Sequence, residues 1–222
     1  MKLYSQATYR VGNHQNKGFT LIEMIGVLAV IAILAAVLVP KVFEAINNAK
    51  VNNAAMSCQT VKTAIADHYA KVGSIPSELV PGSPTNTVLP LPQEQYDQVL
   101  MTEQFLDKPF ATKIGDGTSG ATGTRVRAFD ITGNGFTMGA AVDGTIGTGF
   151  ALSGGSTNTM VGSAGVEAVI TGVTANDAKD LNDRIDGPSL GAALNADDFN
   201  GRVKYAAPVN GVTTVYIYLT HR

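Results

Sequence analysis

The longest uncharged stretch of the protein lies near its N-terminus. Met24 to Val39 are sixteen consecutive residues without a charged side chain or a hydrogen-bonding polar group. Counted from Phe19, the apolar stretch covers twenty-one residues, and only Thr20 and Glu23 interrupt it. At 1.5 Å per residue a helix of this length spans about 30 Å, which is the thickness of a bilayer core. The pattern therefore predicts a membrane-spanning helix over residues 19–40.

After Pro40 the pattern becomes amphipathic and predicts that the same helix continues through residues 41–72. We expect Pro40 to kink or locally unwind the helix, because proline removes a backbone hydrogen bond, and Gly26 is a second weak point. Gly73 is a normal helix stop. Apolar residues recur at steps of three and four, which is typical of one buried helical face: Val51, Ala54, Cys58, Val61, Ile65, His68 with Tyr69, and Val72.

Residues 73–222 fit an α+β head with an antiparallel sheet. A proline-rich loop over residues 73–92 precedes a short helix predicted from Gln93 to about Phe105. Thr174 has the spacing of an N-cap for a second helix, and Asn210-Gly211 is a strong hairpin signal. Short runs of β-forming residues predict strands at Arg125–Ile131, Phe136–Val142, Val166–Thr171, Arg202–Ala206 and Val212–Thr220.

Composition removes several classes of function. Charged residues make up 15% of the protein, against roughly 25% in soluble domains, and the net charge of −2 argues against a nucleic-acid partner. The single cysteine excludes an intrachain disulfide.

Gly115 to Gly120 match the GxGxxG pattern, but no helical pattern follows, so a glycine-rich loop is the better interpretation. We find no catalytic motif and expect a protein that is not an enzyme.

The charges around the apolar stretch suggest how it is used. Residues 1–18 contain three basic residues and no acidic one, which predicts a cytoplasmic N-terminus. No small-x-small site follows the stretch, so it does not resemble an ordinary secretory signal. Glu23 inside an apolar span costs roughly 2.5–3.5 kcal/mol, and Lys17 lies outside the span. We therefore expect its partner to be a new amino terminus or another molecule.

Lys17-Gly18-Phe19-Thr20-Leu21-Ile22-Glu23, followed by the apolar run and Pro40, resembles the class III signal of type IV prepilins and type II secretion pseudopilins. The resemblance implies the pilin fold, a long N-terminal helix packed on an antiparallel sheet. It implies that a prepilin peptidase removes residues 1–18 by cutting between Gly18 and Phe19, and methylates the new amine of Phe19. That amine is the expected counter-ion for Glu23 of a neighbouring subunit, where the pair would set the register of a helical filament.

The resemblance also implies partners and a location. These are other copies of the same protein, the peptidase, an inner-membrane assembly platform with its ATPase, and an outer-membrane secretin. The head would be periplasmic while a single helix anchors the subunit in the inner membrane, and the assembled filament would lie in the periplasm or on the cell surface. Pilus and secretion pseudopilus remain open. Two other interpretations also stay open: a minor or adhesive subunit whose head binds a ligand or surface, and a signal-anchored periplasmic enzyme or binding domain.

No cofactor is expected. Four aspartates near turns are calcium candidates, because carboxylates are the ligands that calcium prefers. They lack the regular spacing of an EF-hand, so we interpret them as solvated loop residues; they are Asp116, Asp143, Asp197 and Asp198.

Overall fold

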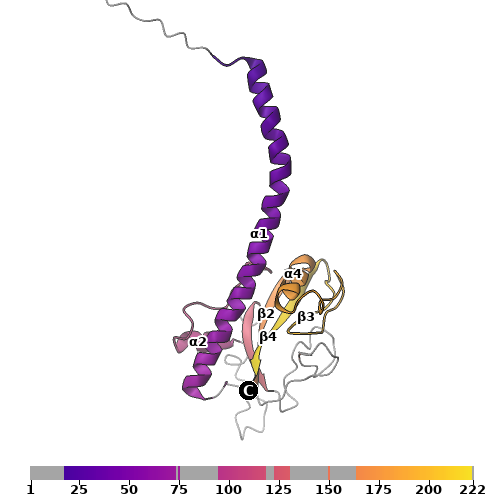
Figure 1. Ribbon diagram of the computed structural model, residues 1–222. Coiled ribbons are helices and arrows are strands. Elements are labelled where there is room, and N and C mark those ends of the chain that lie inside the picture. The colour runs from indigo at the N-terminus through magenta and orange to yellow at the C-terminus, as the bar shows by residue number, and fades with distance from the viewer. Residues whose placement is uncertain are drawn as a thin grey trace, which may run out of the picture. The chain divides into compact units, whose positions relative to one another are not determined.

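The computed structural model describes residues 18–73, 75, 95–118, 123–130, 150 and 164–221. The protein divides into two compact units, residues 1–44 and 45–222, which are described separately. Helix α1 (Leu21–Val72) begins in the first unit and ends in the second (Figure 1).

In the first unit, every described residue of α1 is exposed. The helix continues without a break through Gly26 and Pro40, so the local unwinding considered for Pro40 is not seen, and a bend there stays a prediction. This part of α1 is long and apolar enough to cross a membrane by length and composition. It coincides with the apolar stretch found in the sequence.

In the second unit, the later half of α1 buries one face, as the sequence pattern predicts. The expectation is wrong at Val72, which is 51% exposed because it lies a full turn beyond the last buried position, His68. Gly73 then ends the helix: its φ is +78°, and its N–H donates to the carbonyl of Tyr69 at 2.8 Å. The buried residues are Val51, Ala54, Cys58, Val61, Ala64, Ile65 and His68, so packing begins about ten residues after Pro40.

The second unit contains a four-stranded antiparallel sheet with the order β1-β2-β4-β3. Its strands are β1 (Arg125–Asp130), β2 (Ala164–Thr174), β3 (Val203–Tyr205) and β4 (Val212–His221). Alternate apolar residues of β2 and β4 form one hydrophobic core with the buried face of α1. An α+β fold, with a long apolar N-terminal helix and an antiparallel sheet, is therefore confirmed.

Two shorter helices accompany the sheet. Helix α2 (Tyr96–Thr102) lies inside the predicted range but is shorter, and it buries Tyr96 and Leu100. Helix α4 (Ala175–Ile185) begins as predicted, because the Thr174 hydroxyl accepts a hydrogen bond from the Asp177 N–H at 3.2 Å. The proline-rich residues 76–92 and the strand expected at Phe136–Val142 lie outside the described residues.

The C-terminal hairpin is also confirmed. Strands β3 and β4 pair as neighbours, and Val209 and Val212 exchange two backbone hydrogen bonds of 2.9 and 3.2 Å. Between them Asn210 and Gly211 have φ values of +55° and +81°. Positive φ at both central residues is the geometry of a type I′ turn, which Asn-Gly favours.

The second face of the sheet buries charge that the sequence pattern did not reveal. Glu167 of β2 is fully buried and forms an ion pair with Arg127, its cross-strand neighbour on β1. Lys204 of β3 is also buried, with its ammonium group 5.5 Å from the ring centre of Phe150. Buried charges that contact a specific partner favour one register of strand pairing. If one strand slipped along the next, a buried charge would lose its partner.

Candidate processing and assembly site

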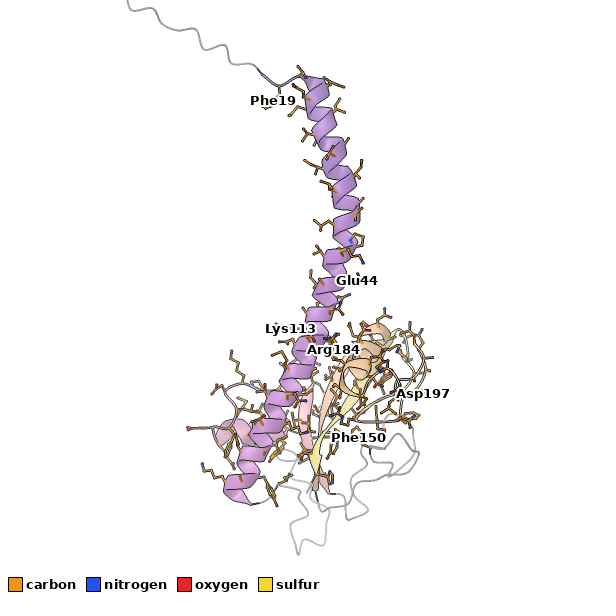
Figure 2. The ribbon with its side chains drawn as sticks, in the orientation of Figure 1. Phe19, Glu44, Lys113, Phe150, Arg184 and Asp197 are labelled. Atoms are coloured by element: carbon orange, nitrogen blue, oxygen red, sulfur yellow. The ribbon has the colours of Figure 1, made fainter. Side chains whose placement is uncertain are left out.

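The residues of the expected cleavage site precede the first turn of α1. Gly18, Phe19 and Thr20 are not helical, and the helix begins at Leu21. Phe19 is 81% exposed and lies at the start of the helix (Figure 2). A Cβ atom at Gly18 would meet nothing within 4 Å. The Gly18–Phe19 bond is therefore outside the helix, and the fold itself does not require glycine at residue 18.

Thr20 and Glu23 form a capping box at the start of α1. The Glu23 carboxylate oxygen Oε2 accepts hydrogen bonds from the backbone N–H and the hydroxyl of Thr20, both at 2.8 Å. In return the Thr20 hydroxyl accepts from the Glu23 N–H at 3.3 Å. The carbonyl of Thr20 accepts the first bond of the helix, from Met24 at 3.2 Å. This satisfies donors that every helix N-terminus leaves open.

The capping box gives Glu23 a partner that the sequence analysis did not name. The partner of Glu23 was expected on a new amino terminus or on another molecule, whereas Thr20 of the same protein already supplies two hydrogen bonds. The Thr-x-x-Glu spacing ahead of an apolar run is the signal that would have found it. Thr20 is a neutral partner, so the charge of Glu23 has no cation among the described residues. The pair with the Phe19 amine stays a prediction.

The first unit exposes a continuous apolar surface. Large hydrophobic side chains from Phe19 to Phe43 are 44–81% exposed, and they surround the helix rather than forming one stripe. Soluble monomers rarely expose an apolar patch of more than a few hundred Å². This segment therefore requires a lipid environment, other apolar helices, or both.

The fold does not bring the described calcium candidates together into one group. One Oδ of Asp116 already accepts from the Thr118 N–H, the Thr118 hydroxyl and the Thr171 hydroxyl, at 2.7–3.0 Å. Partial burial raises the pKa of Asp116, but these hydrogen bonds together outweigh it and lower the pKa. Asp197 is exposed, and Asp143 lies outside the described residues. Over the described part of the protein, no three His, Cys, Asp or Glu side chains form a group that could hold a metal ion.

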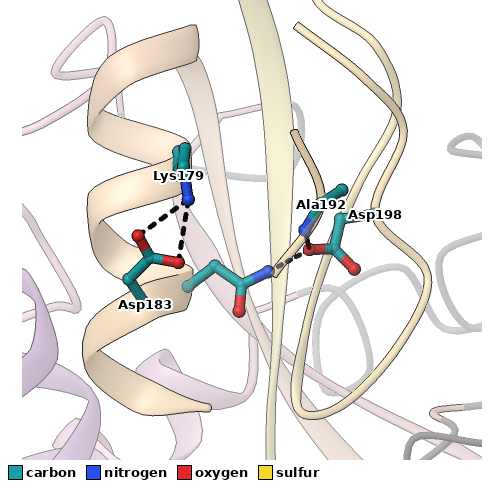
Figure 3. A network of polar contacts seen from close by, with 5 residues as sticks. Lys179, Asp183, Ala192 and Asp198 are labelled. Atoms are coloured by element: carbon teal, nitrogen blue, oxygen red, sulfur yellow. Dashed lines mark hydrogen bonds and ion pairs between the residues drawn. The ribbon is translucent and has the colours of Figure 1, made fainter. Parts of the chain in front are cut away.

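Asp198 has a structural environment instead. Its buried carboxylate accepts from the Asn182 side chain of α4 and from the Ala192 N–H at 2.8 Å (Figure 3). It also accepts from the Asn200 N–H at 3.1 Å. Burial raises the pKa of Asp198. The Asp198 carboxylate thereby holds the loop after α4 against the helix. Both of its oxygens accept hydrogen bonds from the protein itself, so no bound ligand is needed to explain its burial.

His68 and Cys58 lie on the buried face of α1, as the sequence suggested. The His68 ring contacts the Tyr96 hydroxyl at 3.0 Å through Nδ1 and the Glu103 carboxylate at 2.9 Å through Nε2. Both ring nitrogens are therefore used in joining α1 to α2 and the residue that follows it. Burial raises the pKa of the Cys58 thiol to about 12, so it behaves as a small hydrophobic side chain.

The glycine-rich segment that begins at Gly115 packs against a bulge in β2. The Asp116 N–H donates to the Thr171 carbonyl at 3.0 Å, and a Cβ atom at Gly115 would lie 2.4 Å from that oxygen. The segment leads into strand β1 rather than into a helix. Its described part therefore lacks the strand-to-helix turn that a dinucleotide site needs.

The N-terminal segment is the part of the protein that matches a known family model. Residues 13–39 match the family model of the prokaryotic N-terminal methylation motif. This protein carries a prepilin-type methylation motif. The motif includes Gly18, Phe19 and Glu23 and extends over the exposed apolar start of α1. The resemblance noted in the sequence is thereby confirmed for this segment.

A fimbrial protein of Neisseria meningitidis (serogroup A, serotype 4A) is similar to part of the protein. The two are 38% identical over 65 residues, which are 29% of this protein and 38% of the fimbrial protein. The match thus spans well under half of the length of either protein. No solved structure matches.

Proposed function

We propose that this protein is the precursor of a pilin or pseudopilin, a subunit without catalytic activity that assembles into a helical filament. One observation carries the proposal: the methylation motif occupies the start of a helix whose first half is exposed and predominantly apolar, in a protein whose other unit is a packed α+β head. The similarity to a fimbrial protein supports it.

Processing is the first step of the proposal. A prepilin peptidase cuts between Gly18 and Phe19 and then methylates the Phe19 amine. The non-helical backbone at these residues supports this step, because a protease must reach a carbonyl that a helix would engage in a hydrogen bond. Cleavage also removes the basic residues Lys2, Arg10 and Lys17, which would otherwise hold the N-terminus at the cytoplasmic surface.

Assembly is the second step. The subunit waits in the inner membrane with its head in the periplasm, and the assembly platform and its ATPase move it into the filament, where apolar helices replace lipid around α1. The Phe19 amine of one subunit pairs with Glu23 of the next. Among the described residues, capping engages Oε2 of Glu23 and no hydrogen bond reaches Oε1, which supports its use by that amine. An outer-membrane secretin would serve a filament that leaves the cell.

The test is the N-terminus of the protein isolated from cells that contain a prepilin peptidase. We expect it to begin at N-methylated Phe19, read by N-terminal sequencing and intact mass. Gly18→Ala should leave the leader attached. Gly26→Ala is the matched control, because a Cβ atom meets nothing within 4 Å at either glycine. A wild-type protein that keeps Met1, or is cut beyond Pro40, would overturn the proposal.

A further inference from the structure

The tip of the β3–β4 hairpin presents an asparagine and a glycine with their reactive groups open to solvent. Asn210 and Gly211 are both exposed. Among the described residues, neither the amide group of the Asn210 side chain nor the Gly211 backbone N–H forms a hydrogen bond; the bonds that close the turn belong to Val209 and Val212. The amide carbon Cγ of Asn210 and the next backbone nitrogen are thus both available for reaction.

The tip is also set apart from the rest of the sheet. The regular pairing of β3 with β4 ends at Tyr205 and Val215. Beyond it, three residues on one arm (206–208) face two on the other (213–214) before the isolated bridge between Val209 and Val212. Val212 is held by β2, where it pairs with Thr174. The base of this arm is held, because the Thr213 hydroxyl donates to the Ala206 carbonyl at 2.9 Å and the Ala207 N–H donates to Asp197 at 2.5 Å. Among the described contacts, residues 208–211 are held by the two bonds between Val209 and Val212, so the backbone of the tip can rotate without breaking the core of the sheet.

The other Asn-Gly pair in the described residues, Asn200–Gly201, is a contrast. Gly201 is buried, and a Cβ atom there would lie 2.5 Å from a carboxylate oxygen of Asp186. The N–H groups on both sides are bonded, that of Asn200 to Asp198 at 3.1 Å and that of Arg202 to Asp186 at 2.7 Å. This backbone cannot rotate without breaking both hydrogen bonds and displacing the buried Gly201.

We propose that Asn210 is a site of spontaneous deamidation, selected by the structure of the hairpin. The Gly211 backbone nitrogen loses its proton and attacks Cγ of Asn210, a new C–N bond forms, the bond between Cγ and Nδ2 breaks, and ammonia leaves. Water then opens the resulting succinimide at either carbonyl, which yields aspartate or β-linked isoaspartate. Water is the only co-reactant. Glycine permits the attack because it places no side chain beside the nitrogen.

The products change the hairpin in two ways. Both add a negative charge to a turn whose neighbours Val209 and Val212 are uncharged. Isoaspartate also places an additional methylene in the backbone, so the positive-φ pair of the turn cannot be kept. The modification accumulates with time in each copy of the protein, and it alters the exposed end of β4 while leaving the core residues in place.

The experiment follows two tryptic peptides of the intact full-length protein, purified in detergent and incubated in mildly alkaline buffer. Tyr205–Arg222 contains Asn210 as its sole asparagine, and Ile185–Arg202 contains Asn200 together with Asn195. We expect the mass gain of amide hydrolysis, and isoaspartate detected by enzymatic methyl labelling, to appear in the first peptide several times faster than at Asn200. In denaturant the two rates should converge, because both sequences are Asn-Gly.

Asn210→Gly is the control variant, since Gly-Gly keeps the primed turn while removing the amide. It should show no mass gain in Tyr205–Arg222 and unchanged chemistry in Ile185–Arg202. Equal rates at Asn200 and Asn210 in the folded protein would overturn the proposal, as would an unchanged Tyr205–Arg222 peptide after the denatured sample has reacted.

Discussion

At the residue scale, His68 shows how much one buried polar side chain can contribute. The His68 ring shares a hydrogen bond with the hydroxyl of the fully buried Tyr96. Its other nitrogen contacts the Glu103 carboxylate. His68→Leu should destabilise the second unit by about 1–3 kcal/mol, because the Tyr96 hydroxyl is left without a partner. Adding Tyr96→Phe should recover part of the loss by removing that hydroxyl.

The rate at which a thiol reagent labels Cys58 reports how often the second unit opens. Only the thiolate reacts with a thiol reagent, and the pKa of about 12 keeps Cys58 protonated at neutral pH until the unit opens. The labelling rate should therefore rise in His68→Leu and fall back in the double variant. If the double variant labels as fast as the single one, the Tyr96 contact does not carry the effect.

At the element scale, α4 depends on the residue that caps it. Thr174 caps the helix through its hydroxyl, and α4 buries Ala178 and Leu181 in the core. Thr174→Ala should cost about 1 kcal/mol and Thr174→Ser much less, since serine keeps the hydroxyl. Denaturant unfolding of the full-length protein in detergent gives both values, and equal losses in the two variants would contradict the capping role.

At the scale of the whole molecule, Glu23 is expected to connect one subunit to the next. Glu23→Val should leave a subunit that is processed and resident in the membrane but does not polymerise alone, because losing one member of a buried pair costs about 3–5 kcal/mol. Glu23→Asp should be intermediate, since its carboxylate is one methylene shorter. The measurement is the yield and length of sheared or purified filaments, normalised to membrane-bound subunit.

Two further variants separate the causes. Glu23→Gln keeps an acceptor for the capping box but removes the charge, so it should fail like Glu23→Val. Glu44→Val removes an exposed acid that pairs with Lys41 at 3.1 Å, and assembly should be nearly normal. Normal filaments from Glu23→Gln would show that capping, and not the ion pair, is what assembly requires.

The elements that the sequence predicted well are those with local signals. The end of α1 at Gly73, the cap of α4 at Thr174 and the Asn210-Gly211 turn each depend on a few neighbouring residues, and the apolar stretch from Phe19 is one continuous run. The motif at Gly18 to Glu23 is of the same kind. The capping box at Thr20 has a local signal as well, but the charge of Glu23 pointed to a cation and not to the neutral hydroxyl three residues before it.

What the sequence by itself determined is therefore the apolar helix, the methylation motif at its start, the stripe of α1 that packs, and most element ends. The tertiary structure alone decided the strand order β1-β2-β4-β3, the burial of Glu167 beside Arg127, the partners of His68, and the exposure of Val72. Each of these depends on which distant segment lies alongside: Glu167 and Arg127 are 40 residues apart, and His68 and Tyr96 are 28 apart. A periodic pattern shows that a face is buried, but it does not say against what, because hydrophobic burial is non-directional and only the closed sheet selects the pairing.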